Sequence, residues 1–340
     1  MIVTRRSDFF IPVILVLAAT PAFLLSDYRL FQLTMVAAYA IAILGLDMLT
    51  GYTGQISLGH GAFYAVGAYT AAILMANFDV PYWATLPIAA LICAGFGFAF
   101  GFPALRLGGL YLALATFALA IAVPQLLKYK AFEAWTGGVQ GIVISKPDPP
   151  FGLKLSQDQW LYLFTLAVAA VLFLLARNLL RGRIGLAMRA VRDHALAAEA
   201  MGIDIALLKT RTFALSAMYT GIAGALGAIA VQFVAPDSFA VFFSITLFVG
   251  LVVGGITSLL GAVFGAIFIV FIPNIADKIS KAAPGAIYGV ILIAFLYLLP
   301  MGFAGLLRRA ARLDACAAPP TKTLAPPPGK MAEEIRIRNG

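Results

Sequence analysis

Charged residues are scarce in this chain, and their scarcity determines the class of protein. Of its 340 residues only 11% are Asp, Glu, Lys or Arg, whereas 62% are apolar. A soluble domain carries about 25% charged residues, so a water-soluble fold is excluded. The composition predicts an all-α polytopic membrane protein, because helices satisfy their backbone hydrogen bonds internally within a bilayer.

Residues and motifs that chemistry would need are also rare or missing. The two cysteines, Cys93 and Cys316, offer neither a disulfide framework nor a metal-ligand spacing. The sequence contains no G-x-x-x-x-G-K-[ST] phosphate loop, no H-E-x-x-H and no G-x-S-x-G, so neither an ATPase nor an intramembrane enzyme is indicated. We therefore expect no metal and no cofactor in this chain. If ATP drives the protein, another chain must hydrolyse it.

Ionisable groups are few within the expected membrane spans. Asp47, His60 and Arg106 are expected near span ends. A carrier driven by protons or sodium usually places carboxylates or histidines deep in the bundle. Their scarcity here argues against ion coupling.

What the chain does contain is a series of long apolar segments. A membrane-spanning helix needs ~20 mostly apolar residues, and ten windows meet this need. They are 9–25, 30–49, 60–77, 82–104, 107–127, 159–176, 212–234, 239–256, 259–276 and 284–304. The sequence thus predicts about ten transmembrane helices, and the alternative for 239–276 is a single re-entrant unit. The first window is expected to be an uncleaved helix rather than an export signal.

The placement of charge predicts the orientation. The segment 177–211 carries seven basic residues and three acids, which makes it cytoplasmic by the positive-inside rule. With ten spans both termini are also cytoplasmic, and the segment 128–158 faces outward. We therefore expect a transmembrane domain at 1–312 and a disordered, Pro/Ala-rich cytoplasmic tail at 313–340.

Glycine pairs at helical spacing predict that helices approach one another closely. The pairs are Gly97/Gly101, Gly250/Gly254, Gly261/Gly265 and Gly285/Gly289. We expect them to pack inside one subunit, and a seam between subunits is the alternative.

One apolar stretch is interrupted by glycine and neutral polar residues: from Gly51 it reads GYTGQISLGHGAFYAVGAYT. Irregular backbone at membrane depth is tolerated only where protein or a water-filled cavity surrounds it. Broken helices can offer their N–H and C=O groups to the charged ends of a zwitterion. The candidate substrate-pathway residues are Gly51, Thr53, Gly54, Gln55, Ser57, Gly59 and His60. The alternative is a glycine-rich cytoplasmic turn with close helix packing, in which His60 is a structural hydrogen-bonding group.

A short helix is predicted within the basic loop. In "DHALAAEAMGI", Asp193 can act as N-cap, alanines fill the helix and Gly202 ends it. One side of this helix is apolar although the loop is aqueous, which is typical of a docking surface. A helix lying on the membrane interface is the alternative. The candidate docking residues are Arg189, Asp193, Ala198, Glu199, Ala200 and Gly202.

The stretches GYTGQISLGHGAFYAVGAYTAA and MRAVRDHALAAEAMGI together resemble the permeases of bacterial branched-chain amino acid ABC importers, specifically the larger M-type subunit. The resemblance runs from about Leu30 to Arg309. The second stretch is similar to the Glu-Ala-Ala coupling loop of importers, with Gly following. Here Met201 stands at the third position in place of alanine.

The resemblance implies one subunit of a five-part complex in the bacterial inner membrane. Its partners would be a homologous, smaller permease, two cytoplasmic ATPase subunits that bind ATP with Mg, and a periplasmic substrate-binding protein. The implied substrates are leucine, isoleucine and valine, which an uncharged pathway suits. Permeases for urea, short amides or aromatic acids in the same family are the alternative, and a gradient-driven carrier is the alternative from another class.

Overall fold

The computed structural model describes residues 18–104, 109–150, 154–279, 281, 283–299 and 302–306. Helices make up most of this part of the chain. They are α2 (Pro21–Leu24), α3 (Asp27–Thr53), α4 (His60–Phe78), α5 (Tyr82–Ala104), α6 (Leu110–Leu127), α7 (Glu133–Thr136), α8 (Gln157–Arg181), α9 (Arg183–Asp193), α10 (Ala195–Ala200), α11 (Ile205–Val231), α12 (Val241–Gly254), α13 (Leu259–Ile279) and α14 (Pro284–Leu298), with the short 3-10 turns η1 (Lys130–Phe132) and η3 (Pro236–Phe239). The strands β1 (Ile142–Val143) and β2 (Phe233–Val234) form an antiparallel ladder, with Ile142 opposite Val234.

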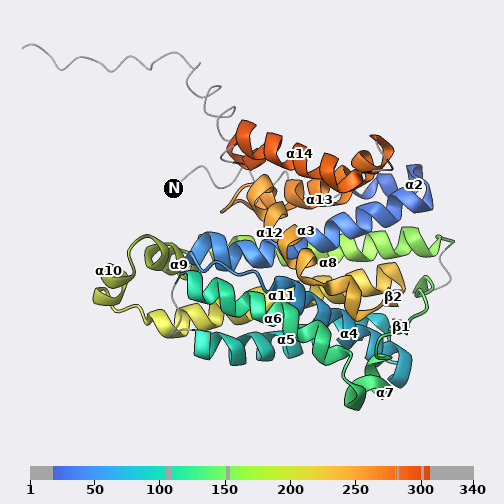
Figure 1. Ribbon diagram of the computed structural model, residues 1–340, viewed down its shortest axis with the longest axis horizontal. Coiled ribbons are helices and arrows are strands. Elements are labelled where there is room, and N and C mark those ends of the chain that lie inside the picture. Colours follow the sequence, from blue (N-terminus) through green and yellow to red (C-terminus); the bar gives the residue numbers. More distant parts are fainter. Residues whose placement is uncertain are drawn as a thin grey trace, which may run out of the picture.

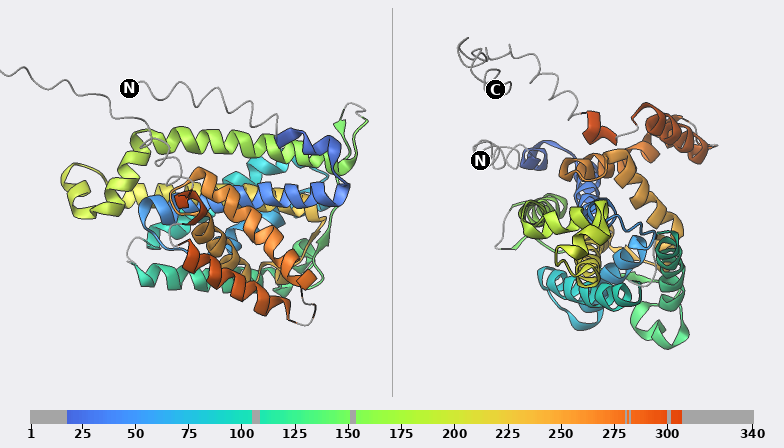
Figure 2. Two further views of the ribbon diagram at one scale, coloured as in Figure 1. Left: turned by 90° about the horizontal axis from the view of Figure 1, so that it is seen from above. Right: turned by 90° about the vertical axis from the view of Figure 1, so that its left-hand side faces the viewer.

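Most of the long helices run along the longest axis of the molecule (Figure 1). The short helices α9 and α10 lie at one end of this bundle, and α7 lies with the β1–β2 ladder at the other end. At the edge of the bundle α14 packs against α13 (Figure 2). The bundle thus has different short elements at its two ends, joined by long apolar helices.

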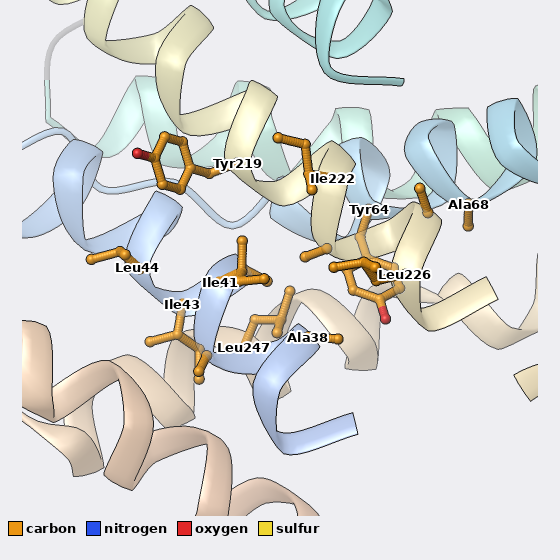
Figure 3. Close-up of a cluster of buried hydrophobic side chains, with 14 of the residues drawn as sticks. Ala38, Ile41, Ile43, Leu44, Tyr64, Ala68, Tyr219, Ile222, Leu226 and Leu247 are labelled. Carbon is orange, nitrogen blue, oxygen red and sulfur yellow. The ribbon is translucent and has the colours of Figure 1, made fainter. Parts of the chain in front are cut away.

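The core is centred on α11, which packs against α3, α4 and α5. Figure 3 shows apolar side chains of α3, α4, α11 and α12 gathered in one cluster. Ile41, Tyr64, Leu226 and Leu247 belong to it, and each is at most 3% exposed. Helices surrounded by protein on every side are apolar all round. This explains why α3 and α11 show no one-sided hydrophobic pattern in the sequence.

The predicted fold class is confirmed, but the predicted number of spans is not. In the described part of the chain, α3, α4, α5, α6, α8, α11 and α13 are long and apolar enough to cross a membrane. The helices α12 and α14 are apolar but have only 14 and 15 residues. The first predicted span, 9–25, falls mostly outside the described residues, and only α2 lies in its last part.

Most of the predicted glycine pairs pack inside this chain. A Cβ added at Gly254 of α12 would come within 2.0 Å of the carbonyl oxygen of Gly261 in α13. An added Cβ would lie between 2.0 and 3.2 Å from another atom of the chain at Gly97, Gly101, Gly250, Gly254, Gly261 and Gly265. At Gly285 and Gly289 of α14 an added Cβ would meet no atom of the described residues within 4 Å.

Candidate functional site

The glycine-rich stretch ends one long helix and begins the next. Helix α3 continues through Gly51 to Thr53 and ends at Gly54. Gly54 has a φ of +71°, the left-handed conformation that glycine adopts without strain. Residues 54–59 are non-helical, and α4 begins at His60. We call residues 54–59 the linker.

Burial alternates along the linker between two edges. Gln55 is 8% exposed and Ser57 is 1% exposed, whereas Ile56 between them is 45% exposed. Gly54 is exposed as well. This alternation is the period of an extended chain. One edge of the linker therefore faces the bundle and the other faces outward.

A series of hydrogen bonds anchors the inner edge to α11 and α3. The Ser216 hydroxyl of α11 donates to the carbonyl oxygen of Gly45 at 2.6 Å, and His60 Nε2 lies 2.6 Å from Ser216 Oγ. Because that hydroxyl hydrogen is used on Gly45, the Ser216 oxygen accepts from His60 Nε2–H. The other ring nitrogen, Nδ1, is then left to accept from Ser57 Oγ at 3.1 Å. His60 is therefore a buried structural link among α3, α4 and α11.

Helix α6 holds the linker, and α12 holds the start of α4. The Leu58 amide donates to Thr116 Oγ1 of α6 at 3.0 Å, and the Gly61 amide in α4 donates to Ser244 Oγ of α12 at 2.9 Å. A Cβ at Gly59 would come within 2.7 Å of the Thr116 carbonyl oxygen. Glycine at this position is therefore needed for the close approach to α6.

The neutral polar side chains of the stretch are bonded within this chain. Gln55 Nε2 donates to Thr53 Oγ1 at 2.9 Å, and Thr53 Oγ1 donates to the carbonyl oxygen of Leu49 at 2.7 Å. Thr50 Oγ1 donates to the carbonyl oxygen of Gln55 at 3.1 Å. The outward edge consequently presents Gly54 and Ile56 rather than the hydroxyl and amide side chains.

Asp47, which the sequence analysis noted only as an ionisable residue near a span end, is a further candidate. Its carboxylate accepts the amide hydrogens of Thr257 at 2.8 Å and Ser258 at 3.1 Å, at the start of α13. A negative charge at a helix N-terminus is stabilised by the helix dipole. Asp47 is 1% exposed and lies in the last third of α3, before the end of that helix at Thr53. The expectation that it lies near a span end stays a prediction. The one signal was its solitary charge in the window 30–49.

The predicted docking helix is present as α10, with two differences from the expectation. Asp193 is the last residue of α9 and pairs with Arg192 at 3.0 Å, so the N-cap of α10 is His194. Ala198 is only 4% exposed and faces the chain itself. The exposed apolar side chains are instead Leu196 at 81% and Met201 at 84%.

The end of α10 follows the prediction, and Arg189 fixes the preceding corner. Gly202, with a φ of +83°, donates to the Glu199 carbonyl oxygen at 2.9 Å. Glu199 and Ala200 are both exposed. Arg189 donates from Nε to the carbonyl oxygen of Gly185 at 3.2 Å, close to the turn between α8 and α9. The outward face of α10 is thus apolar with one acidic group.

Comparison with known proteins gives a consistent result over most of the chain. A family model described as branched-chain amino acid transport system / permease component matches residues 28–299. The high-affinity branched-chain amino acid transport system permease protein LivM of Escherichia coli (strain K12) is 30% identical over 338 residues, covering 93% of this chain and 79% of the relative. LivM of Salmonella typhimurium (strain LT2) is also 30% identical, covering 88% of this chain and 76% of the relative.

A second type of relative is more distant. The permease protein LivH of the same high-affinity system in Escherichia coli (strain K12) is 24% identical over 300 residues, covering 80% of this chain and 92% of the relative. No solved structure matches the chain.

Proposed function

We propose that this chain, which belongs to the family of branched-chain amino acid transport system permease components, forms one half of a pore that imports leucine, isoleucine and valine. It is a permease subunit of an ABC importer, and ATP is hydrolysed by separate subunits. The chain is 30% identical to LivM and 24% identical to LivH, which supports the proposal that it is the M-type half of the pore. The other half would be a homologous permease of the LivH type.

The linker is the observation that supports a pathway through this chain. Its inner edge is anchored by Ser57 and His60, while its outer edge leaves Gly54 and Ile56 exposed. Backbone N–H and C=O groups at a helix break can bind the carboxylate and ammonium of a zwitterion without a fixed charge. The exposed Ile56 suits an aliphatic substrate side chain, because apolar surfaces favour contact with one another in water.

The remaining partners are proposed from the arrangement of the two ends. Two ATPase subunits, which bind ATP with Mg, would dock on α10 through Leu196 and Met201, with Glu199 at the rim of the contact. A periplasmic binding protein would deliver the amino acid at the opposite end, near the β1–β2 ladder. In the proposed orientation the docking end and both termini would lie in the cytoplasm of a bacterium and the chain in its inner membrane.

Reconstitution of the complete complex in proteoliposomes tests the proposal. We expect uptake of radiolabelled leucine that requires ATP and the binding protein and persists when the proton gradient is dissipated. Uptake driven by an ion gradient without ATP would contradict the importer mechanism. A cognate binding protein that takes urea, a short amide or an aromatic acid but no leucine would contradict the substrate class.

A further inference from the structure

We propose that Arg192 is the positioning residue that couples the docking loop to the broken transmembrane segment. This inference rests on the proposed function, because it concerns how ATPase movement at α10 reaches the substrate pathway. The two stretches that carry the sequence resemblance are separated by more than a hundred residues, and Arg192 joins them directly.

The guanidinium of Arg192 binds both stretches at once. Its Nη1 donates to the carbonyl oxygen of Gly51 in α3 at 2.8 Å, and its Nε donates to Asp193 Oδ1 at 3.0 Å. The stem of the side chain lies on the linker, since a Cβ at Gly54 would be 3.1 Å from Arg192 Cγ. The planar fork of arginine suits two simultaneous bonds in a way that lysine cannot reproduce.

The Arg192 hydrogen bond satisfies a carbonyl oxygen that has no donor within α3 because the helix ends there. In a continuing helix the Gly51 carbonyl would accept the amide of Gln55, but that amide donates to the Leu49 carbonyl at 3.2 Å. The Arg192 guanidinium donates to the Gly51 carbonyl in place of the Gln55 amide. A cation is also favourable at a helix C-terminus. The end of α3 is therefore completed by a residue of the docking loop rather than by α3 itself.

Asp47 extends this connection to a second helix break. A Cβ at Gly51 would come within 2.1 Å of Asp47 Oδ1, so the carboxylate lies directly against the residue whose carbonyl Arg192 binds. The same carboxylate holds the amides of Thr257 and Ser258 in the turn between α12 and α13. The hydroxyl of Tyr52 also donates to the Thr257 carbonyl, at 3.4 Å.

These contacts make one unit of the docking loop, the end of α3, the linker and the α12–α13 turn. A shift of α9 and α10 must therefore move the end of α3 or break the Arg192 bond. If the bond is absent, the ATPases can still dock and hydrolyse ATP, but their movement is no longer transmitted to the linker.

The test compares Arg192→Gln and Arg192→Lys with Arg183→Gln in the reconstituted complex. Arg183 is an exposed arginine at the other end of α9, for which the described residues offer no hydrogen bond or ion pair. We expect Arg192→Gln to retain the ATPases but to lower leucine uptake per ATP hydrolysed about tenfold, the equivalent of ~1.4 kcal/mol in coupling. The uptake per ATP of Arg192→Lys is expected to lie between those of Arg192→Gln and wild type. The uptake per ATP of Arg183→Gln is expected to match wild type.

A disulfide provides a second test that does not depend on the arginine. A Cβ at Gly54 would be 3.9 Å from the Arg192 Cβ, within the range of about 3.5–4.5 Å found across disulfides. In a background without Cys93 and Cys316, the double variant Gly54→Cys/Arg192→Cys should be uncoupled when reduced and regain coupling when oxidised. Gly54→Cys alone is the control for the linker substitution.

The outcomes separate this inference from the function on which it rests. Wild-type uptake per ATP in Arg192→Gln, or oxidation that cross-links the pair without restoring coupling, would overturn the role of Arg192. A wild-type complex that shows no ATP-dependent uptake would instead overturn the proposed function.

Discussion

Gly51 must be glycine because of its neighbours, not because of its backbone conformation. It lies inside α3, where alanine would ordinarily be more favourable by about 0.5–1 kcal/mol. An added Cβ would, however, lie 2.1 Å from Asp47 Oδ1 and 2.9 Å from Ile256 Cγ2. The carboxylate cannot turn away freely because it holds two amides of the α12–α13 turn.

Gly51→Ala is therefore expected to destabilise the protein although it removes no hydrogen-bonding atom. Displacing the carboxylate leaves buried amides unpaired, at a cost of ~1–3 kcal/mol for each group. Thermal unfolding of the purified protein in detergent measures the change. The matched control is Gly95→Ala in α5, where an added Cβ meets nothing within 4 Å. Equal melting temperatures for Gly51→Ala and wild type would show that the carboxylate is not held in place.

At the scale of elements, the linker and α10 each have one face that packs against the rest of the chain and one face that is exposed. In the linker, Ser57 faces the bundle and Ile56 faces outward. In α10, Ala198 faces the chain itself and Leu196 faces outward. A functional contact with substrate or partner must use the outward faces, so substitutions there separate function from folding.

Ile56→Trp is expected to lower substrate uptake severalfold while leaving stability close to that of wild type. Ile56 is 45% exposed and belongs to the proposed pathway, so a larger side chain obstructs passage without disturbing the core. Uptake assays and thermal unfolding are measured together. Leu91→Trp, at a site on α5 that is 73% exposed, is the control. Undiminished uptake by the Ile56 variant would place the outer edge of the linker away from the pathway.

Leu196→Asp is expected to weaken retention of the ATPase subunits, because it places a charge in the centre of the proposed apolar contact. The loss of a buried leucine contact is worth about 1.5–3 kcal/mol, enough to reduce co-purification severalfold or more. Quantitative co-purification from membranes measures it. The same change at Val139, 65% exposed near the opposite end, is the control. If both variants retain the ATPases equally, α10 is not the docking element.

At the scale of the whole molecule, the two ends differ in how their charges are balanced. Near the β1–β2 ladder, Lys128 pairs with Asp237 and Lys146 pairs with Asp158. At the other end Arg181 and Arg183 are exposed. The segment 177–211 at that end carries seven lysine and arginine residues, against four in the segment 128–158. An excess of lysine and arginine beside membrane spans favours the cytoplasmic side, which supports the proposed orientation.

Cysteine labelling measures this orientation directly. Pro149 precedes α8 and Arg183 follows it, so the helix separates the two positions. In a background without Cys93 and Cys316, an impermeant thiol reagent added to intact cells whose periplasm it can enter should label Pro149→Cys. Arg183→Cys should react only after the inner membrane is opened. Labelling of Arg183→Cys in sealed cells would reverse the orientation.

Some features follow from local physics, and the sequence alone was sufficient to predict them. Continuous hydropathy identified the apolar helices from α3 onward, because burial in lipid depends on composition along the chain. Gly202 marked the end of α10, where it adopts a positive φ. The amphipathic character of α10 was also readable, although not the inward direction of Ala198.

Other features were decided only by the tertiary structure. His60 is hydrogen-bonded to Ser216, Arg192 to Gly51, and Asp47 to the start of α13. Each pair is separated by more than a hundred residues of sequence. No periodicity or motif encodes such pairs, since each depends on which helices become neighbours. A buried polar group must find its partner wherever packing places one, and that requirement is met only once the helices have assembled.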